Sequence, residues 1–385
     1  EGRADFAIET LGDGTVLSLG EVELEIMETP GHTPESICVI VRERPGTEPY
    51  GVLTGDTLFI GDVGRPDLLA SFGVTADELA RSLYASVRRV MALPDATRVF
   101  PAHGAGSACG KHLSNETEST IGDQRRSNYA VAPMTEEQFV AVVTDGQPTA
   151  PLYFAFDATM NRQARDLLDE HSAPAPLTLD EAVALKGAGA VVVDTREAAD
   201  YARGHLRGSL NVGLGGRFAE YTGDVVRPDQ EIVLVCDPGH EMESKVRLAR
   251  IGFDRVVGVL SEPLLAFIDH PDLVDQSSRL TAGELADRTG ALPDLQVVDV
   301  RNPGEVRLGV IPGSIHVPLP RLLDRLGELD PDRPTVVVCA SGFRSSVGAS
   351  VLTSNGFRDV SDLLGGFEAW ANAGFPIEHL QDAES

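Results

Sequence analysis

An internal repeat in the second half of the chain constrains the fold more than any other sequence feature. Residues 191–212 and 297–317 both begin with a β-branched apolar run that ends in Asp, place Arg two positions later, and pass through Gly-Ser to a second apolar run. Each copy then continues to another apolar run that ends in a cysteine, Cys236 in the first copy and Cys339 in the second. Because self-similarity at a fixed interval marks a repeated folding unit, the chain is predicted to contain two homologous domains.

The order of elements within the repeat indicates the fold class. Short apolar strands alternate with helical segments in both copies, which predicts an α/β fold with a mostly parallel sheet. We place the first copy at residues 177–272 and the second at residues 279–382, with turn-rich linkers before and between them. A chain of 385 residues is expected to hold roughly two to three domains, so the first third requires a fold of its own.

Charge and cysteine content narrow the classes of partner. A formal net charge of −27 argues against nucleic-acid binding, because a phosphate backbone would be repelled. No apolar run approaches the ~20 residues that span a bilayer, so no membrane partner is expected. The four cysteines lie far apart at Cys38, Cys109, Cys236 and Cys339, which favours individually reactive thiols in a reducing cytoplasm over a disulfide framework. A homo-oligomer is compatible with these features.

Residues 339–344, Cys-Ala-Ser-Gly-Phe-Arg, predict a nucleophile between a strand and a helix. Sites in open α/β sheets lie beyond the carboxyl ends of the strands, and the N–H groups at a helix start favour an anion there. Gly342 permits the tight backbone, Arg344 suits a pair of anionic oxygens, and Ser345 adds a hydroxyl. We therefore interpret Cys339 and Arg344 as catalytic and Gly342 and Ser345 as substrate-binding. The alternative is a buried cysteine that ends a core strand.

The second copy resembles the rhodanese family. The resemblance is carried by the Cys-x-x-Gly-x-Arg-Ser loop, by Asp299-Val-Arg301, by Gly313–His316 and by the closing run Leu364–Trp370. It covers residues 279–382 and implies transfer of a sulfane sulfur between a donor, such as thiosulfate or a persulfide, and a thiol or sulfite acceptor.

The first copy departs from that pattern. Its loop reads Cys-Asp-Pro-Gly-His-Glu, so that Glu241 stands where the second copy has Arg344. Glu241 and Asp237 oppose a thiolate and an anionic donor, and Pro238 removes one N–H group. We therefore expect the first copy to be a rhodanese-like domain without activity and with a structural role. A sulfur-relay role for Cys236 is the alternative.

Three apolar strands in the first third each end in a side chain that can bind a metal. His32 follows a Pro-Gly turn, Asp56 follows Thr-Gly, and His103 follows Phe-Pro-Ala. Each alone can be a turn residue with its polar atoms satisfied. Because the three recur at successive strand ends, the pattern favours a metal site.

These residues and the runs Gly55–Gly61 and Gly64–Asp67 resemble the persulfide dioxygenase branch of the metallo-β-lactamase fold. The resemblance runs from about residue 7 to residue 165. It implies a mononuclear Fe(II), with Zn²⁺ as the alternative, held by His32 and Asp56. His103 would be a ligand only in a dinuclear centre. Residues 1–134 are thus assigned to this domain and residues 135–176 to a helical connector.

The family's H-x-H-x-D-H motif does not occur in this sequence. One metal ligand and about half of the αββα sandwich are therefore missing, and we expect a partial sandwich followed by two rhodanese-like α/β domains. We also expect the parent protein to possess the full domain. Dioxygenase activity of the sequence as it stands depends on that ligand.

Two further residues near this centre are candidates. Cys109 lies six residues beyond His103 in a glycine-rich loop beside Lys111, and we interpret it as a catalytic thiol that carries or positions a persulfide. The alternative is an incidental loop cysteine. Arg65 is the candidate for binding the carboxylate of a thiol substrate, and the alternative is an ion pair with Asp67.

These features together favour an enzyme of persulfide detoxification. Iron would oxidise a low-molecular-weight persulfide with O₂, and Cys339 would transfer sulfane sulfur to or from sulfite, with thiosulfate as product or donor. One alternative is a metallo-hydrolase of the glyoxalase II type fused to a sulfurtransferase. The other is a non-enzymatic sulfur carrier or scaffold.

Overall fold

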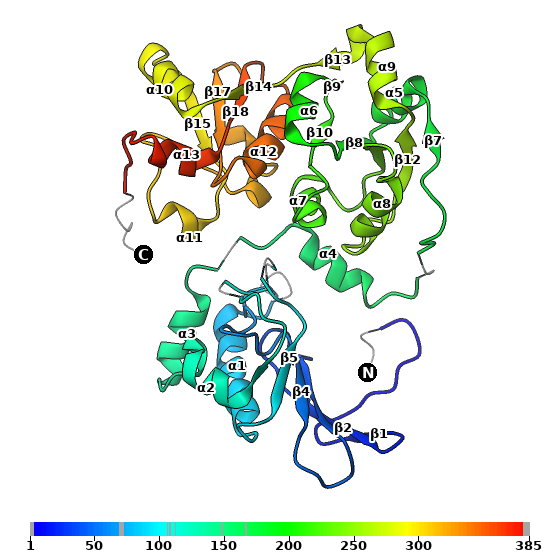
Figure 1. Ribbon diagram of the computed structural model, residues 1–385, viewed down its shortest axis with the longest axis vertical. Coiled ribbons are helices and arrows are strands. Elements are labelled where there is room, and N and C mark those ends of the chain that lie inside the picture. Colours follow the sequence, from blue (N-terminus) through cyan, green and yellow to red (C-terminus); the bar gives the residue numbers. More distant parts are fainter. Residues whose placement is uncertain are drawn as a thin grey trace. The chain divides into compact units, whose positions relative to one another are not determined.

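A computed structural model of the chain divides into two compact units, which are described separately (Figure 1). The first unit comprises residues 1–150 and 162–164, and the second comprises residues 151–161 and 165–385. The residues described by the structure are 4–68, 73–105, 107, 109–111, 113–147, 149–165 and 168–379. In none of these ranges does a helix have the length and apolar character needed to cross a membrane.

The first unit is built on one sheet whose strands lie side by side in chain order. Neighbouring strands are antiparallel except β4 and β5, which are parallel. The strands are β1 (Val16–Leu19), β2 (Val22–Glu28), β3 (Ile37–Arg42), β4 (Gly51–Gly55), β5 (Arg98–Pro101) and β6 (Ser119–Thr120). Because β4 and β5 are parallel neighbours, their carboxyl ends meet at one edge of the sheet.

Helices cover one face of this sheet. The helix α1 (Ala76–Met91) begins with a capping box of Thr75 and Glu78 and buries its apolar side against strand residues such as Ile40 and Val52. The helices α2 (Ile121–Ser127) and α3 (Glu136–Thr144) follow β6, and Phe139 of α3 joins the same core.

The opposite face of the sheet carries exposed apolar side chains. Ile37 of β3 is 42% exposed and Leu53 of β4 is 45% exposed. Among the described residues this unit holds a single sheet with its helices, so the expected partial sandwich is confirmed.

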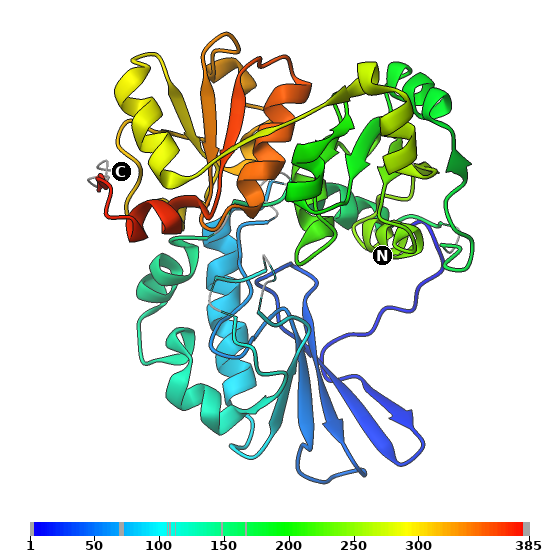
Figure 2. The same cartoon turned by 45° about the horizontal axis from the view of Figure 1, so that its top comes forward.

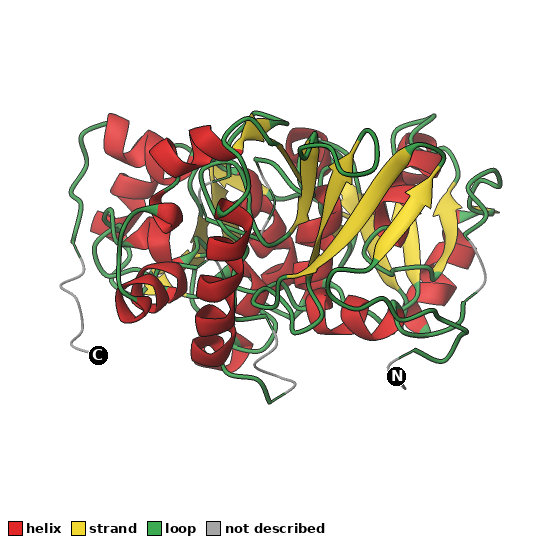
Figure 3. Cartoon of the chain, turned by 90° about the horizontal axis from the view of Figure 1, so that it is seen from below, coloured by secondary structure: helices red, strands yellow, loops and turns green. Residues whose placement is uncertain are grey.

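The second unit contains the two repeat copies (Figure 1), and their sheets have the same topology. Figure 3 shows the strands of the chain in yellow and the helices in red. In the first copy the parallel strands lie in the order β10-β8-β11-β12-β7, and in the second they lie in the equivalent order β16-β15-β17-β18-β14. The strands of the first copy are β7 (Pro176–Leu177), β8 (Val191–Asp194), β10 (Leu210–Asn211), β11 (Ile232–Val235) and β12 (Val256–Leu260). Those of the second copy are β14 (Ser278–Leu280), β15 (Gln296–Asp299), β16 (Ile315–His316), β17 (Thr335–Val338) and β18 (Val360–Leu363).

Helices pack on both faces of each sheet, as the buried, β-branched strands require. In the second copy α12 lies on one face and α10 and α13 lie on the other (Figure 2). The helices of the first copy are α5 (Leu179–Gly187), α6 (Ala198–Arg203), α7 (Phe218–Val225), α8 (Glu241–Ala249) and α9 (Pro263–Asp269). Those of the second copy are α10 (Ala282–Ala291), α11 (Pro303–Val306), α12 (Phe343–Ser354) and α13 (Gly366–Asn372).

The two copies share one hydrophobic cluster, and each copy also has a cluster of its own. A single cluster of buried residues joins Leu234 and Leu248 of the first copy to Val337 and Leu352 of the second. Hydrogen bonds add to this contact, because Ser346 and Ser350 of α12 both bond to Asn211, as described below. The repeat is therefore a sequence duplication whose two products fold against each other.

The segment between the units is divided between them. In the first unit Phe139 and Val143 of α3 are core residues. In the second unit α4 (Tyr153–Met160) packs on the first copy, where a side chain on Gly223 would lie 2.2 Å from the ring of Tyr153. Residues 135–176, expected to be one connector, thus supply a helix to each unit.

Candidate functional site

The second copy places Cys339 at the end of β17, directly before α12. Its side chain is buried, with the residue 1% exposed. The N–H group of Gly342 donates to Cys339 Sγ at 3.1 Å, and the Cys339 thiol donates to Ser345 Oγ at 3.6 Å. Gly342 has φ +101°, and a Cβ there would lie 2.9 Å from the nitrogen of Gly365, so the turn requires glycine. These contacts direct the sulfur atom toward the start of the helix.

N–H groups at the start of α13 hold the cysteine loop in place. Phe367 N–H donates to the Cys339 carbonyl at 2.7 Å, and Glu368 N–H donates to the Ala340 carbonyl at 3.0 Å. Gly366 has φ +58°, and a Cβ there would lie 2.4 Å from the Cys339 carbonyl oxygen. The closing run Leu364–Trp370 therefore positions the loop that carries the nucleophile.

Arg344 is occupied by a carboxylate in this structure. Its two terminal nitrogens donate to the two carboxylate oxygens of Glu305 at 2.7 and 2.6 Å, and its side chain is 13% exposed. Burial raises the pKa of Glu305, but hydrogen bonds from Arg344 outweigh burial, and the pKa lies below its ordinary value. An anionic substrate would therefore have to compete with Glu305 for this guanidinium. Glu305 was not singled out from the sequence, although its spacing from Asn302 fits the capping box that the structure contains.

The first copy supplies a wall of the same site through α7. The ring of Tyr221 lies 5.4 Å from the ring of Phe343, the residue next to Arg344. Arg217 and Glu220 form an ion pair on this helix. Asp224, also on α7, is buried, and burial raises its pKa well above the ordinary value. No sequence motif pointed to these residues, because their proximity arises from packing between the copies.

Asn211 fixes α12 to the first copy. Ser346 Oγ donates to Asn211 Oδ1 at 2.7 Å, and Asn211 N–H donates to Ser350 Oγ at 2.9 Å. All of these groups are buried. The serine that follows Ser345 in the loop motif is thus an interface residue.

The equivalent cysteine of the first copy has different surroundings. Burial raises the pKa of Cys236, and Glu241 and Asp194 add to the rise against hydrogen bonds from Thr195 and Ser244. A cavity of about 300 Å³ beside it is lined in part by Asp237 and Glu243. A neutral thiol next to acidic groups is poorly suited to binding an anionic donor.

The Asp-x-Arg strand ends act as braces in both copies. Arg301 Nη2 lies 2.6 Å from Asp299 Oδ2 and donates to the Gly309 carbonyl at 2.8 Å. In the first copy Arg196 makes the same ion pair with Asp194 and donates to the Gly204 carbonyl at 3.0 Å. Both ion pairs are buried, so this part of the motif has a structural function that persists in both copies.

In the first unit His32 and Asp56 lie in direct contact. His32 Nε2 is 3.3 Å from Asp56 Oδ2, and the other ring nitrogen, Nδ1, is 2.9 Å from the Arg65 carbonyl oxygen. Burial lowers the pKa of His32, which favours the neutral ring, with Nδ1–H donating to that carbonyl. The position before His32 requires a glycine, because a Cβ on Gly31 would lie 2.5 Å from Leu83 Cα of α1. Nε2 is thereby left facing the carboxylate.

His103 reaches the same carboxylate from β5. Its Nδ1 lies 2.7 Å from Asp56 Oδ1, and the Asp56 carboxylate raises the pKa of His103 to about 10. The parallel pairing of β4 with β5 explains this contact, since Asp56 and His103 follow the same edge. The structure therefore brings together the three side chains that the strand ends singled out.

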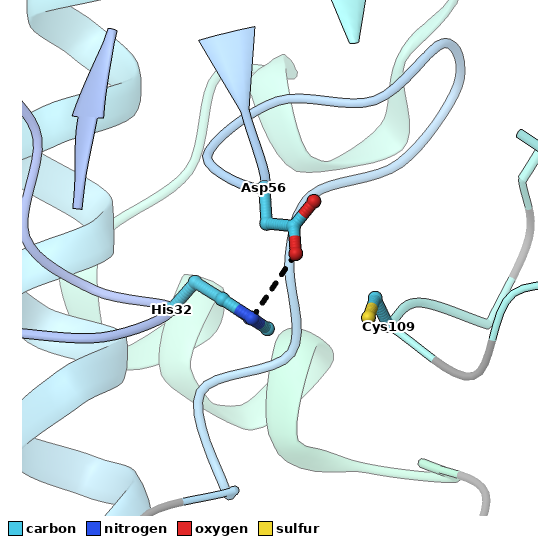
Figure 4. A group of neighbouring side chains, drawn as sticks. All are labelled: His32, Asp56 and Cys109. Atoms are coloured by element: carbon cyan, nitrogen blue, oxygen red, sulfur yellow. Dashed lines mark ion pairs between the residues drawn. The ribbon is translucent and has the colours of Figure 1, made fainter. Parts of the chain in front are cut away.

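Cys109 lies beside these residues (Figure 4). The metal-binding atoms of His32, Asp56 and Cys109 all lie within 4.8 Å of one another. Asp56 Oδ1 is buried and lies 2.7 Å from His103 Nδ1, so a second imidazole nitrogen adjoins this group. An imidazole nitrogen, a carboxylate oxygen and a thiol this close together fit a transition-metal ion.

Arg65 organises the centre through its backbone. Its carbonyl oxygen accepts from His32, and its N–H group donates to the Cys109 carbonyl at 2.9 Å. The guanidinium is 1% exposed and donates to both carboxylate oxygens of Asp67, at 2.7 and 2.6 Å. The predicted substrate-binding role is thus corrected to the ion pair that was its alternative, because a buried and paired guanidinium does not face a ligand.

Different segments of the chain match different protein families. Residues 178–268 and 281–373 match the "Rhodanese-like domain" family, and residues 1–103 match the "Metallo-beta-lactamase superfamily". A sulfurtransferase from Allochromatium vinosum is 34% identical over 100 residues, which cover 26% of this chain and 94% of that protein.

Two further proteins are similar to larger parts of the chain. A probable metallo-hydrolase from Burkholderia pseudomallei is 36% identical over 138 residues, covering 35% of this chain and 44% of that protein. The chain thus spans less than half the length of that relative. The crystal structure of a metallo-beta-lactamase from Staphylococcus aureus has a TM-score of 0.57 and 27% identity, and the match covers 66% of this chain and 70% of that one.

Proposed function

The chain belongs to the rhodanese-like family and carries a metallo-beta-lactamase superfamily segment ahead of its two rhodanese-like domains, and from this premise we propose a two-step enzyme of persulfide metabolism. The first step oxidises a low-molecular-weight thiol persulfide with O₂ at a non-haem iron. The second step moves a sulfane sulfur through Cys339 to or from sulfite, with thiosulfate as the product or the donor.

The sulfur-transfer step is carried by the contact between Gly342 N–H and Cys339 Sγ at the head of α12. The Cys339 thiolate attacks the outer sulfur of thiosulfate, the S–S bond breaks, and sulfite leaves with the bonding electron pair. An acceptor thiolate or sulfite then takes the sulfane sulfur from the Cys339 persulfide, and the thiolate is restored. Neither transfer needs an external oxidant. The N–H groups at the helix start stabilise the negative charge throughout.

Arg344 and Ser345 complete this step. Arg344 holds the oxygens of an anionic donor once Glu305 has been displaced, and its planar fork matches two oxygens. Ser345 Oγ, 3.6 Å from Cys339 Sγ, can donate a hydrogen bond to the thiolate. The loop carbonyls are fixed by α13, so the nucleophile is held before a donor arrives.

The iron would be held by His32 and Asp56. Iron supplies open coordination positions for O₂ and a persulfide when it is bound. The protein's own part is to fix the neutral tautomer of His32 through the Arg65 carbonyl and to aim the carboxylate of Asp56. The convergence of the His32, Asp56 and Cys109 donor atoms within 4.8 Å of one another is the observation that supports a cation here.

The test uses the chain loaded with Fe(II) without oxygen. O₂ consumption is measured with glutathione persulfide, beside a Cys339→Ser variant. We expect both proteins to consume O₂ and only the wild type to convert the resulting sulfite to thiosulfate. Absence of O₂ uptake by iron-loaded protein would refute the dioxygenase step and leave the sulfur-transfer step to be judged on thiosulfate formation.

A metallo-hydrolase is the second candidate for the first unit. It is favoured by His103, whose Nδ1 lies 2.7 Å from Asp56 Oδ1, because His103 would be a further ligand of a dinuclear zinc centre, and zinc would supply an activated water for hydrolysis. Metal content distinguishes the two functions, since the oxygenase binds one iron and the hydrolase two zincs. A thioester such as S-lactoylglutathione is the substrate with which hydrolysis would be measured.

A further inference from the structure

We propose that Cys109 is a thiolate ligand of the metal centre, bound to the same ion as His32 and Asp56. The inference rests on the metal centre of the proposed function and adds a sulfur donor to it. The three residues come from separate segments, after β2, after β4 and after β5, and they converge on one place (Figure 4). A persulfide-carrying role needs Cys109 only near the metal, whereas a ligand role needs it in the coordination sphere.

The spacing of the donor atoms suits one ion. Bonds from zinc-like metals to nitrogen, oxygen and sulfur are about 2.0–2.3 Å long, which places two ligand atoms at most about 4.6 Å apart. The donor atoms of His32, Asp56 and Cys109 lie within 4.8 Å of one another without an ion. Because two ligand atoms of a tetrahedral ion lie about 3.6 Å apart, side-chain movements of about 1 Å bring all three into bonding distance.

The backbone that follows the Cys109 side chain is anchored at two points. Its carbonyl oxygen accepts from Arg65 N–H at 2.9 Å, and the N–H group of Lys111 donates to Asp62 Oδ2 at 2.8 Å. The Arg65 carbonyl also accepts from His32. One peptide segment thus sets the positions of the imidazole and the thiol together, as partners outside the coordination sphere do in metal sites.

Charge balance also favours a thiolate. The imidazole of His32 is neutral as a ligand, and a carboxylate with a thiolate contributes two negative charges, which neutralise a divalent cation. A partly buried ion is costly without such compensation. On binding, the S–H bond of Cys109 is replaced by a sulfur–metal bond, the proton goes to solvent, and no electron is transferred.

A sulfur ligand restricts the choice of metal. Thiolates favour zinc, iron and cobalt, whereas magnesium, calcium and manganese prefer oxygen ligands. The site should therefore discriminate against Mg²⁺ and Mn²⁺. Modification of the Cys109 sulfur should weaken metal binding, which would link occupancy of the centre to the state of this thiol.

Cobalt binding to the full chain tests the proposal. Co²⁺ is titrated without oxygen into the wild type, a Cys109→Ser variant and a Cys236→Ser variant. Cys236→Ser is the control, because it removes a cysteine from the second unit and leaves Cys109 in place. We expect a near-ultraviolet thiolate-to-cobalt charge-transfer band in the wild type and the control, and no such band in Cys109→Ser. Cobalt affinity should fall about tenfold or more in Cys109→Ser, at least as much as outer partners contribute.

Alkylation of the wild type gives a second readout that requires no variant. Iodoacetamide labelling of Cys109, followed by peptide mass spectrometry, should be slowed at least tenfold by bound Zn²⁺ and not by Mg²⁺. Cobalt binding of equal strength in Cys109→Ser, without a charge-transfer band in the wild type, would overturn the ligand role and leave a metal centre without sulfur. Failure of the wild type to bind cobalt at all would overturn the metal centre itself.

Discussion

The ion pair between Arg344 and Glu305 predicts that the enzyme restrains its own affinity for anionic donors. Replacing Glu305 with Gln removes the charge but keeps an oxygen for the N–H group of Asn302, which Glu305 accepts at 2.9 Å. The fork of Arg344 is then free for the donor. We therefore expect Glu305→Gln to bind thiosulfate more tightly.

The magnitude follows from the contact. Hydrogen bonds to charged groups contribute about 1.5–3 kcal/mol, and the lower end applies because the Glu305 side chain is 33% exposed. An amide retains part of this interaction, so about 1.4 kcal/mol is the upper expectation, which corresponds to about a tenfold fall in KM. The maximal rate should change little, since Cys339 and its helix are unaltered.

Steady-state kinetics with thiosulfate as donor and cyanide as acceptor measure this effect. Glu328→Gln is the matched control, because Glu328 makes a similar two-point contact with Arg325 at 2.7 and 2.6 Å elsewhere in the second copy. KM should be unchanged in the control. A KM that stays constant or rises in Glu305→Gln would refute the competition and show that Glu305 orients Arg344 for binding.

Three other outcomes are expected. Incubation with thiosulfate should add one sulfur to wild type and Cys236→Ser, but not to Cys339→Ser, as intact mass spectrometry would show; loading at Cys236 would contradict the assignment. Gly366→Ala should destabilise the protein by about 1–3 kcal/mol and slow sulfur transfer, because its Cβ would lie 2.4 Å from the Cys339 carbonyl, whereas Gly283→Ala, with open space around it, should not. Burial lowers the pKa of His205, so below about pH 6.5 the unfolded state binds more protons than the folded state. The free energy of unfolding is therefore at its full value above about pH 7, and it falls with acidification by up to ~1.4 kcal/mol per pH unit. Urea unfolding of His205→Phe should lose that slope, and an unchanged slope would assign it elsewhere.

The sequence predicted features that depend on periodicity and strand ends. The duplicated strand pattern led to two parallel sheets of equal topology, which the fold and the family matches confirm. Asp56 and His103 meet because the strands before them are parallel neighbours, which strand-end reasoning anticipates. Their roles, and that of His32, stay predictions until metal binding is measured.

Features that depend on packing between distant segments were not accessible. The role of Arg65 turned on whether Asp67 or a ligand met its guanidinium, and spacing alone left both open. The wall contributed by Tyr221 depends on how the copies dock, for which the sequence has no periodic signal. Glu305 had a signal, but a capping box by itself does not reveal that its carboxylate also reaches Arg344.

The buried cluster shared by the two copies makes the stability of each copy depend on the other. The loop that follows Cys236 is exposed, so substitutions at residues 237–240 leave this cluster intact. Leu234 and Asn211 differ from this loop, because Leu234 lies in the shared cluster and Asn211 bonds to α12. A substitution in the first copy that disrupts this shared cluster should therefore also disturb the fold around Cys339 in the second copy.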